Sequence, residues 1–253
     1  MAKATPPPAP TNRLLAMLPP DEYGRLLSYL QPVTLELRQV LQKARAPIEY
    51  AYFPTSGATS FLTVMEGGAA IEVGTVGSEG MVGSTAVLGV AVTSPHQVIV
   101  QVAGAGLRVE AAVLTRAAVR DGGLRRVLAL YHAAFLAQVS QSVACNGLHP
   151  VGRRCCRWLL VTHDRVEGDA MPLTHEFLGF MLGVRRASVT EVLGPLRDRG
   201  LIRYARGVIT VLDRAGLEAA SCECYRTVRD EYDRIFADAP SVRDRTDAPR
   251  PAP

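Results

Sequence analysis

The side chains best suited to chemistry in this sequence are the arginines between Gly183 and Gly207. This segment holds six arginines against two acidic residues, a local net charge of +4, which equals the net charge of the whole 253-residue chain. The guanidinium group donates paired hydrogen bonds to a phosphate or to the major-groove edge of guanine. Neutralising phosphates supplies most of the non-specific affinity of a protein for DNA. The concentration of charge therefore predicts double-stranded DNA as a partner.

The residues around these arginines have the pattern of two helices and a hairpin. Thr174 can cap the start of a helix, and Glu176 lies in its first turn, where the helix dipole favours a carboxylate. Gly183 permits the positive φ of a tight turn between helices. A second helix is predicted over 185–199, followed by a β-hairpin that turns at 205–207. This order of elements is typical of a winged helix-turn-helix.

In such a module the second helix lies in the major groove, and its first residues reach the base edges. The residues expected to contact DNA are Arg185, Arg186, Ser188, Thr190 and Glu191 of the second helix, Thr174 before the first helix, and Arg206 of the wing. A ligand-binding module that uses its winged helix for protein–protein contact is the alternative. The five histidines are scattered and no nucleophile or phosphate-loop motif accompanies them, so we expect no catalytic residues and no enzymatic activity.

The first half of the chain has a different pattern of apolar residues. A helical pattern over 12–30 is followed by short β-like runs, broken by glycine, at 50–53, 59–64, 70–76 and 98–102. Short strands at this spacing favour a β-sandwich or a β-roll. The longest strongly apolar stretch lies at 86–92, and the N-terminus lacks an apolar signal core, so we expect a cytoplasmic protein that does not contact a membrane.

A helical period returns over 124–146. An apolar stripe recurs there every three or four residues, comprising Leu124, Leu128, Tyr131, Phe135, Val139 and Ser142. The near-heptad steps favour pairing with the same helix of a second protomer, so the stripe is the predicted interface of a homodimer. Packing on the chain's own domain is the alternative. Asn146 and Gly147 are expected to end the helix and to form a hinge.

Five cysteines occur, at Cys145, Cys155, Cys156, Cys222 and Cys224. An odd number without a secretion signal argues against a disulfide framework. Cys222 and Cys224 could supply two metal ligands, but no second Cys/His pair stands at zinc-finger spacing. We therefore expect reduced, buried thiols, no metal and no cofactor. A redox role for Cys145 would require exposure or a lowered pKa.

The C-terminal module resembles the Crp/Fnr family of bacterial transcription regulators. The matching residues are Leu173-Thr174, Gly183, Arg186–Thr190, Leu193, Leu196 and Gly200–Ile202. The first half is similar to the cyclic-nucleotide-binding β-roll of that family at Tyr52–Pro54, Ser56-Gly57 and Val76–Gly83. The resemblance implies a homodimer on a palindromic operator, a small-molecule effector, and RNA polymerase as a further partner.

Three departures from the family pattern stand out. Cyclic-nucleotide binders carry an arginine where this sequence has Ser94–Gln97, so cyclic AMP is not the expected effector. Ala187 replaces an acidic base-reading residue, so the half-site should differ. Pro195 lies inside the second helix, where we expect a kink or an early end. The candidate residues for another anion are Gly77, Glu79, Gly80, Met81, Val82 and Gly83, with a plain turn as the alternative.

The predicted fold class is therefore α+β, with a cyclic-nucleotide-binding-like β-roll, a long dimerisation helix and a winged helix-turn-helix. The predicted organisation is a disordered tail at 1–11, a β-roll sensory domain at 12–123, the dimerisation helix at 124–146, the DNA-binding domain at 147–220, a C-terminal helix at 221–239, and a disordered tail at 240–253.

Overall fold

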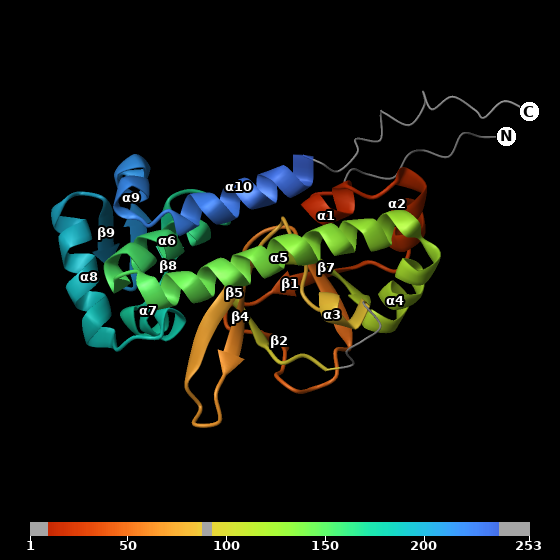
Figure 1. Cartoon of the computed structure of the whole chain (residues 1–253), viewed down its shortest axis with the longest axis horizontal. Helices are drawn as coiled ribbons and strands as arrows, with labels where there is room; N and C mark the ends of the chain where they lie inside the picture. The colour runs from red at the N-terminus through yellow and green to blue at the C-terminus, as the bar shows by residue number, and fades with distance from the viewer. Residues whose placement is uncertain (1–9, 88–92, 238–253) are drawn as a thin grey trace, which may run out of the picture.

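The computed structural model describes residues 10–87 and 93–237. A β-rich N-terminal domain and a helical C-terminal domain lie at opposite ends of one long helix, α5 (Figure 1). The two tails predicted to be disordered fall outside the described residues, apart from residues 10 and 11.

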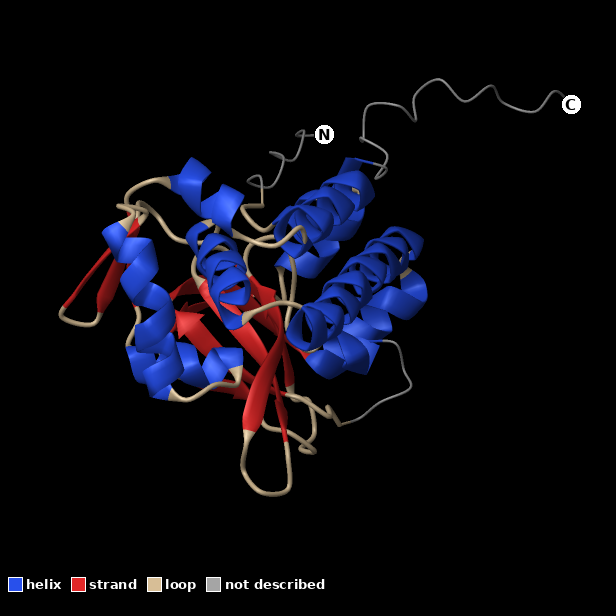
Figure 2. Cartoon of the chain, turned by 60° about the vertical axis from the view of Figure 1, so that its left-hand side comes forward, coloured by secondary structure: helices blue, strands red, loops and turns tan. Residues whose placement is uncertain are grey.

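The N-terminal domain contains two antiparallel sheets, with strand orders β1-β7-β3 and β2-β6-β4-β5. The strands are β1 (Gln31–Leu35), β2 (Val40–Gln42), β3 (Tyr50–Pro54), β4 (Ala58–Val64), β5 (Ala70–Val76), β6 (Gln97–Val102) and β7 (Gly104–Glu110). Helices α1 (Arg13–Ala16), α2 (Pro20–Leu27), α3 (Ser84–Val87) and α4 (Ala111–Arg120) lie around them. All four strands predicted from the β-like runs are confirmed. Figure 2 shows the strands enclosed by helices, with the hairpin of β4 and β5 extending away from the body.

The sheets form because apolar side chains of their strands meet in one core. Leu35, Phe53, Phe61 and Val98 are buried there together with residues of α1, α2 and α5. Asn12 ties α1 to this core: its Oδ1 accepts from the amides that begin α1, and its Nδ2 donates to Pro54 O at 2.8 Å. The N-terminal helices are thus part of the β-rich domain.

Helix α5 (Gly122–Leu148) corrects the predicted dimer face. Leu124, Leu128 and Tyr131 are buried in the core of the chain's own domain, and the Tyr131 hydroxyl donates to Met81 O at 2.7 Å. Phe135 packs against the same core, and Ser142 is also buried. The first four residues of the predicted stripe therefore pack inside the chain's own domain, where α5 lies against β5, α4 and α1, whereas Val139 is half-buried.

The end of α5 also differs from the prediction. The helix continues through Asn146 and Gly147 to Leu148, and His149 is its C-terminal cap. By length and composition α5 could cross a membrane. One face of α5 packs into the core of the β-rich domain, and 33% of its most apolar stretch is buried in the chain.

The C-terminal domain begins with α6 (Val151–His163) and contains α7 (His175–Leu182), α8 (Arg186–Asp198) and α9 (Arg214–Ala220). Strands β8 (Ala170–Pro172), β9 (Ile202–Ala205) and β10 (Val208–Val211) form an antiparallel sheet in the order β8-β10-β9. Its core includes Trp158, Leu178 and Val189, and also Leu62 and Ile99 from strands β4 and β6. The two domains therefore share apolar contacts.

The last helix, α10 (Cys224–Ala237), packs along α5 and returns toward the N-terminal domain (Figure 1). Gln138 of α5 donates to the Tyr232 hydroxyl at 3.3 Å. Near the end of α10, Arg13 lies 3.7 Å from the Asp233 carboxylate and over the ring of Phe236, 4.3 Å from its centroid. α10 thus connects the C-terminal domain to α1.

Candidate nucleic-acid interface

Helix α7 begins and ends as the sequence predicts. The Thr174 hydroxyl accepts from the Phe177 amide at 3.2 Å and caps the helix, with Glu176 in its first turn. Gly183 closes the helix with φ +65°, a conformation that glycine adopts without strain. A Cβ on Gly179 would lie 2.9 Å from Val184 O, so this glycine lets α7 approach the turn closely. The role of Gly179 is not evident from the sequence, because a glycine inside a helix is expected only to weaken that helix.

Helix α8 is held in place by its inner face. Val189, Leu193 and Leu196 are buried against the rest of the domain. The helix continues through Pro195 to Asp198, so the expected early end is wrong. Pro195 has no amide hydrogen to donate to the Glu191 carbonyl. Because both residues are exposed, solvent can hydrate that carbonyl.

The exposed start of α8 carries the predicted DNA-contacting side chains. Arg185, Arg186, Thr190 and Glu191 are exposed, whereas Ser188 is half-buried. Arg185 has extended backbone and occupies the cap position before the first helical residue. Within the described residues, neither Arg185 nor Arg186 forms an ion pair or a side-chain hydrogen bond. Both guanidinium groups are therefore available to an anion.

A histidine that the sequence analysis left unassigned joins the three parts of this module. His175 Nδ1 lies 3.0 Å from the Thr190 hydroxyl of α8, and its ring lies 4.3 Å from the ring of Tyr204 in the wing. Burial and the nearby Arg186 lower the pKa of His175, so the ring is neutral at pH 7. The contact fixes the wing and α8 against the start of α7.

The wing turn completes the surface. Arg206 is exposed and has φ +49°, and Gly207 follows with φ +77°. A Cβ on Gly207 would lie 3.7 Å from the Thr174 methyl group, so the turn is next to the start of α7. We call the surface formed by Thr174, Arg185, Arg186, Thr190 and Arg206 the basic face.

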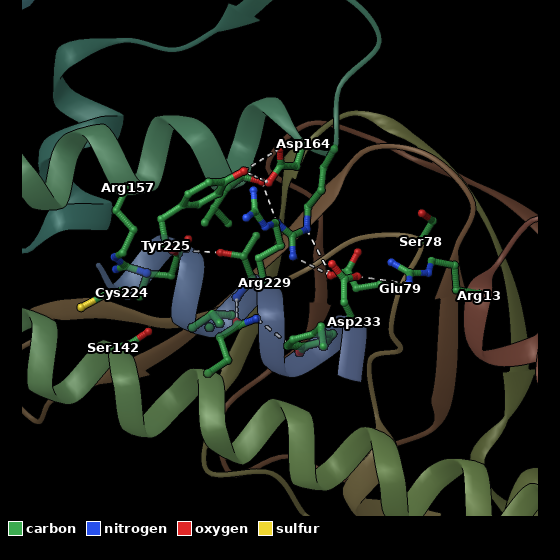
Figure 3. Close-up of a pocket in the computed structure, with 18 residues that line it drawn as sticks. Arg13, Ser78, Glu79, Ser142, Arg157, Asp164, Cys224, Tyr225, Arg229 and Asp233 are labelled. Carbon is green, nitrogen blue, oxygen red and sulfur yellow. Dashed lines mark hydrogen bonds and ion pairs between the residues drawn. The ribbon is translucent and has the colours of Figure 1, made fainter. Parts of the chain in front are cut away.

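A cavity of about 170 Å³ lies between β5, α5, α6 and α10. Figure 3 shows Glu79, Asp164, Tyr225, Arg229 and Asp233 around it. Glu79 pairs with Arg165 at 2.6 Å, and Asp164 accepts hydrogen bonds from the Tyr225 hydroxyl. Many of the polar groups that line this cavity therefore already have partners in the chain.

The ion pair of Glu79 and Arg165 joins the two domains. Burial alone would raise the pKa of the Glu79 carboxyl, but Arg165 and the Gly77 amide outweigh it and hold that pKa below its usual value. The Gly77 amide donates to Glu79 at 2.9 Å, and Arg165 also donates to Val161 O at 2.6 Å. Both partners are thus fixed by further hydrogen bonds.

The candidate anion-binding loop is a tightly packed turn. Met81 and Val82 are fully buried, and a Cβ on Gly80 would lie 2.7 Å from the Tyr131 ring. Gly83 has φ +84° beside strand β3, and the Gly77 amide is taken by Glu79. The loop packs on its own core, an arrangement that favours a structural turn over an anion site. Of the predicted set, Glu79 lines the cavity.

The segment that replaces the family's phosphate-binding arginine offers a neutral side chain. His96 is half-buried, and burial lowers its pKa below the usual value. Its Nδ1 lies 3.4 Å from the Thr63 hydroxyl. Burial thus disfavours the charged imidazolium that could offset a cyclic phosphate, and residues 94–97 include no arginine in its place.

Comparison with known proteins connects this architecture to a regulator class. The family model described as a Crp-like helix-turn-helix domain matches residues 153–220. No curated protein matches the sequence. Among solved structures, FixK2 from Bradyrhizobium japonicum is 18% identical over 76% of this chain and 98% of its own, with a TM-score of 0.65.

A Crp/Fnr-family transcriptional regulator from Thermus thermophilus is 21% identical over 76% of this chain and 98% of its own, with a TM-score of 0.62. A Crp/Fnr-family regulator from Eubacterium rectale is 16% identical over 80% of this chain and 94% of its own, with a TM-score of 0.64. Residues 153–220 are therefore a Crp-like helix-turn-helix domain, and the chain has the fold of the Crp/Fnr family of transcription regulators.

Proposed function

We propose that the protein is a homodimeric, DNA-binding transcription regulator that reads a palindromic operator through α8. The observation that carries the proposal is the basic face. Its two free guanidinium groups, Arg185 and Arg186, lie at the exposed start of the helix that a Crp-like domain presents to DNA. Arg206 of the neighbouring wing would contact the phosphate backbone.

A second face of α5 supports the dimer. Its residues are exposed and recur in alternating steps of four and three, and we call them the α5 seam: Ala129, Ala133, Leu136, Ser140, Val143 and Gly147. Leu136 and Val143 are 66% and 65% exposed, which is unusual for side chains of this size. A heptad period with small residues suits close packing against the same helix of a second protomer.

The symmetry of such a dimer determines the form of the operator. Two copies of α8 related by a two-fold axis contact two half-sites about 34–36 Å apart, which is one helical turn of DNA. The two half-sites are read in opposite directions, so the operator is an inverted repeat. RNA polymerase would be the further partner if the protein activates transcription, and the protein would act in the cytoplasm.

The N-terminal domain is proposed as a structural or effector domain that does not use cyclic AMP. The cavity of about 170 Å³ is smaller than the roughly 300–1,000 Å³ of typical small-molecule sites. Arg165, which could bind a phosphate, is already paired with Glu79 at 2.6 Å. His96 supplies no positive charge at pH 7. An effector would therefore have to displace an existing ion pair or bind elsewhere.

The test is the selection of duplexes bound by the full-length protein from a random pool, followed by sequencing. We expect an inverted repeat, and binding to it should weaken steeply as salt rises, because phosphate contacts release counterions. A scrambled duplex of the same composition is the control. Equal affinity for both duplexes would overturn the proposal. If the winged helix instead contacts protein, no motif should be enriched, and cross-linking should capture a protein partner.

A further inference from the structure

Four side chains capable of binding a metal meet where the long helix ends. Cys145 and His149 lie one helical turn apart at the end of α5. Cys222 and Cys224 lie at the junction of α9 and α10. Their ligand atoms all fall within 4.8 Å of one another. We call these four residues the Cys3His cluster.

Two of the ligand–ligand distances inside the Cys3His cluster are close to those of a tetrahedral zinc site, and all of them are within 4.8 Å. Cys145 Sγ lies 3.6 Å from Cys222 Sγ, and Cys224 Sγ lies 3.5 Å from His149 Nδ1. Zinc bonds of about 2.3 Å to sulfur and about 2.0–2.1 Å to nitrogen place tetrahedral ligands about 3.6–3.8 Å apart. The side chains can therefore bind one ion with little movement.

The surroundings of the cluster are those of a closed structural site. Cys145, Cys222 and Cys224 are buried, and the His149 side chain is 17% exposed. His149 turns Nδ1 toward the thiols and Nε2 toward the Glu223 carboxylate, at 3.3 Å. Metal-binding histidines commonly donate the other ring N–H to a carboxylate in this way, which fixes the tautomer and the orientation of the ring.

Neighbouring groups stabilise bound thiolates. Gln141 donates from Nε2 to Cys224 Sγ at 3.0 Å. Arg154 and Arg157 interact electrostatically with Cys145. Three thiolates and one Zn²⁺ leave a net charge of −1, which these two arginines offset.

We propose that Cys145, His149, Cys222 and Cys224 bind one Zn²⁺ ion per protomer as a structural site. Binding releases the thiol protons to solvent, and the ion joins the end of α5 to the start of α10. Because α6 begins at Val151, two residues after His149, the ion also fixes the connection through which α5 holds the DNA-binding domain. The site is distinct from the basic face and does not depend on the proposed function.

A disulfide is the chemical rival. It would require the two sulfurs of Cys145 and Cys222 to approach from 3.6 Å to about 2.05 Å. It would leave Cys224 and the pair of His149 and Glu223 without a role. Full-length protein purified without a polyhistidine tag distinguishes the two states by its metal content and by its mass under non-reducing conditions.

We expect about one zinc per protomer by elemental analysis, released when a mercurial reagent blocks the thiols. Cys224→Ser should reduce the zinc content by more than tenfold, whereas His149→Cys should retain it, because four thiolates also bind zinc. Cys155→Ala is the matched control, since Cys155 is a buried thiol of the same domain outside the cluster. Its zinc content should not change.

Replacement of zinc by Co²⁺ provides a readout that a misfolded variant cannot imitate. The wild type and His149→Cys should show the visible bands of tetrahedral Co²⁺ and thiolate-to-metal charge transfer, and Cys224→Ser should lose them. Metal-free wild-type protein with four free thiols or a Cys145–Cys222 disulfide would overturn the proposal. So would iron in place of zinc. Failure to select an operator would leave the metal content unchanged, so the two proposals fail separately.

Discussion

Arg186 is the side chain on which the proposed base reading most depends. It is exposed in the first turn of α8 and lies beside His175, whose pKa it helps to lower. Arg186→Ala should weaken binding to the selected operator by about 1–3 kcal/mol and relax the preference at one base position in each half-site. Fluorescence anisotropy at fixed salt measures both effects.

Arg197→Ala is the control for this experiment. Arg197 is exposed on the same helix, but it lies near the far end and pairs with Asp198 at 2.8 Å. Its removal should change the affinity less and leave the base preference intact. Equal losses for the two variants would show that α8 contributes only general positive charge.

The ion pair of Glu79 with Arg165 makes part of the free energy of unfolding depend on pH. Glu79→Gln leaves Arg165 buried without its counter-charge, so unfolding at pH 7 should cost about 3–5 kcal/mol less than in the wild type. The pKa of Glu79 is lowered in the folded state, so its contribution is complete above the usual carboxyl pKa and is lost as pH falls through the lowered value. Urea unfolding at several pH values should show the two proteins converging in acid.

The matched control for Glu79 is Asp230→Asn. Asp230 is exposed and lies 3.4 Å from Arg229. An exposed pair contributes less than about 1 kcal/mol, and this variant should change little at any pH. A Glu79→Gln loss that stayed constant down to strong acid would show that packing, rather than charge, is responsible.

At the scale of the element, α5 has two apolar faces with different partners. One face is buried in the β-rich domain, and the α5 seam is exposed. Leu136→Asp and Val143→Asp should each convert the dimer to monomer, because a charge would be buried between the two helices. Light scattering after size-exclusion chromatography measures the mass.

Met65→Asp is the control for the seam variants. Met65 is 61% exposed and directly follows β4 in the turn to β5. The tip of this hairpin lies away from α5 (Figure 1). This variant should remain dimeric. A wild-type protein that is monomeric at micromolar concentration would contradict the seam as an interface, and so would seam variants that stay dimeric.

The sequence was sufficient to predict elements whose signal is local. The β-like runs, the capping Thr174 and the turn at Gly183 depend on neighbouring residues only, and all are present. The two faces of α5 could not be distinguished, because both carry apolar residues at helical spacing and only tertiary packing decides which is buried. The packing of the candidate loop with Gly77 was not predictable for the same reason: the Met81 carbonyl accepts from Tyr131 of α5, which is 50 positions away in the chain.

The Cys3His cluster was missed because its two halves are far apart in the chain. Cys145 and Cys222 are separated by 77 positions, and zinc-finger spacing describes only ligands that are close in sequence. Cys145 and His149 are one turn apart on a helix, which is a sufficient spacing for two ligands. The packing of α10 on α5 brings the two halves together, and no pattern of neighbouring residues predicts that packing.

At the scale of the whole molecule, the two domains are joined through several contacts. Leu62 and Ile99 of the sheets enter the core of the C-terminal domain, and Glu79 pairs with Arg165 after α6. We expect one cooperative thermal transition, with equal calorimetric and van't Hoff enthalpies when the van't Hoff value is fitted for a dimer that dissociates as it unfolds. Two resolved transitions would show that the domains unfold independently.

The return of α10 to α1 has a consequence for synthesis. The N-terminal domain leaves the ribosome first, but Arg13 meets Asp233 and Phe236 only after α10 has emerged. Until then, the side of α5 that α10 covers stays open to water or to chaperones. The nascent chain thus lacks one wall of the cavity until α10 docks.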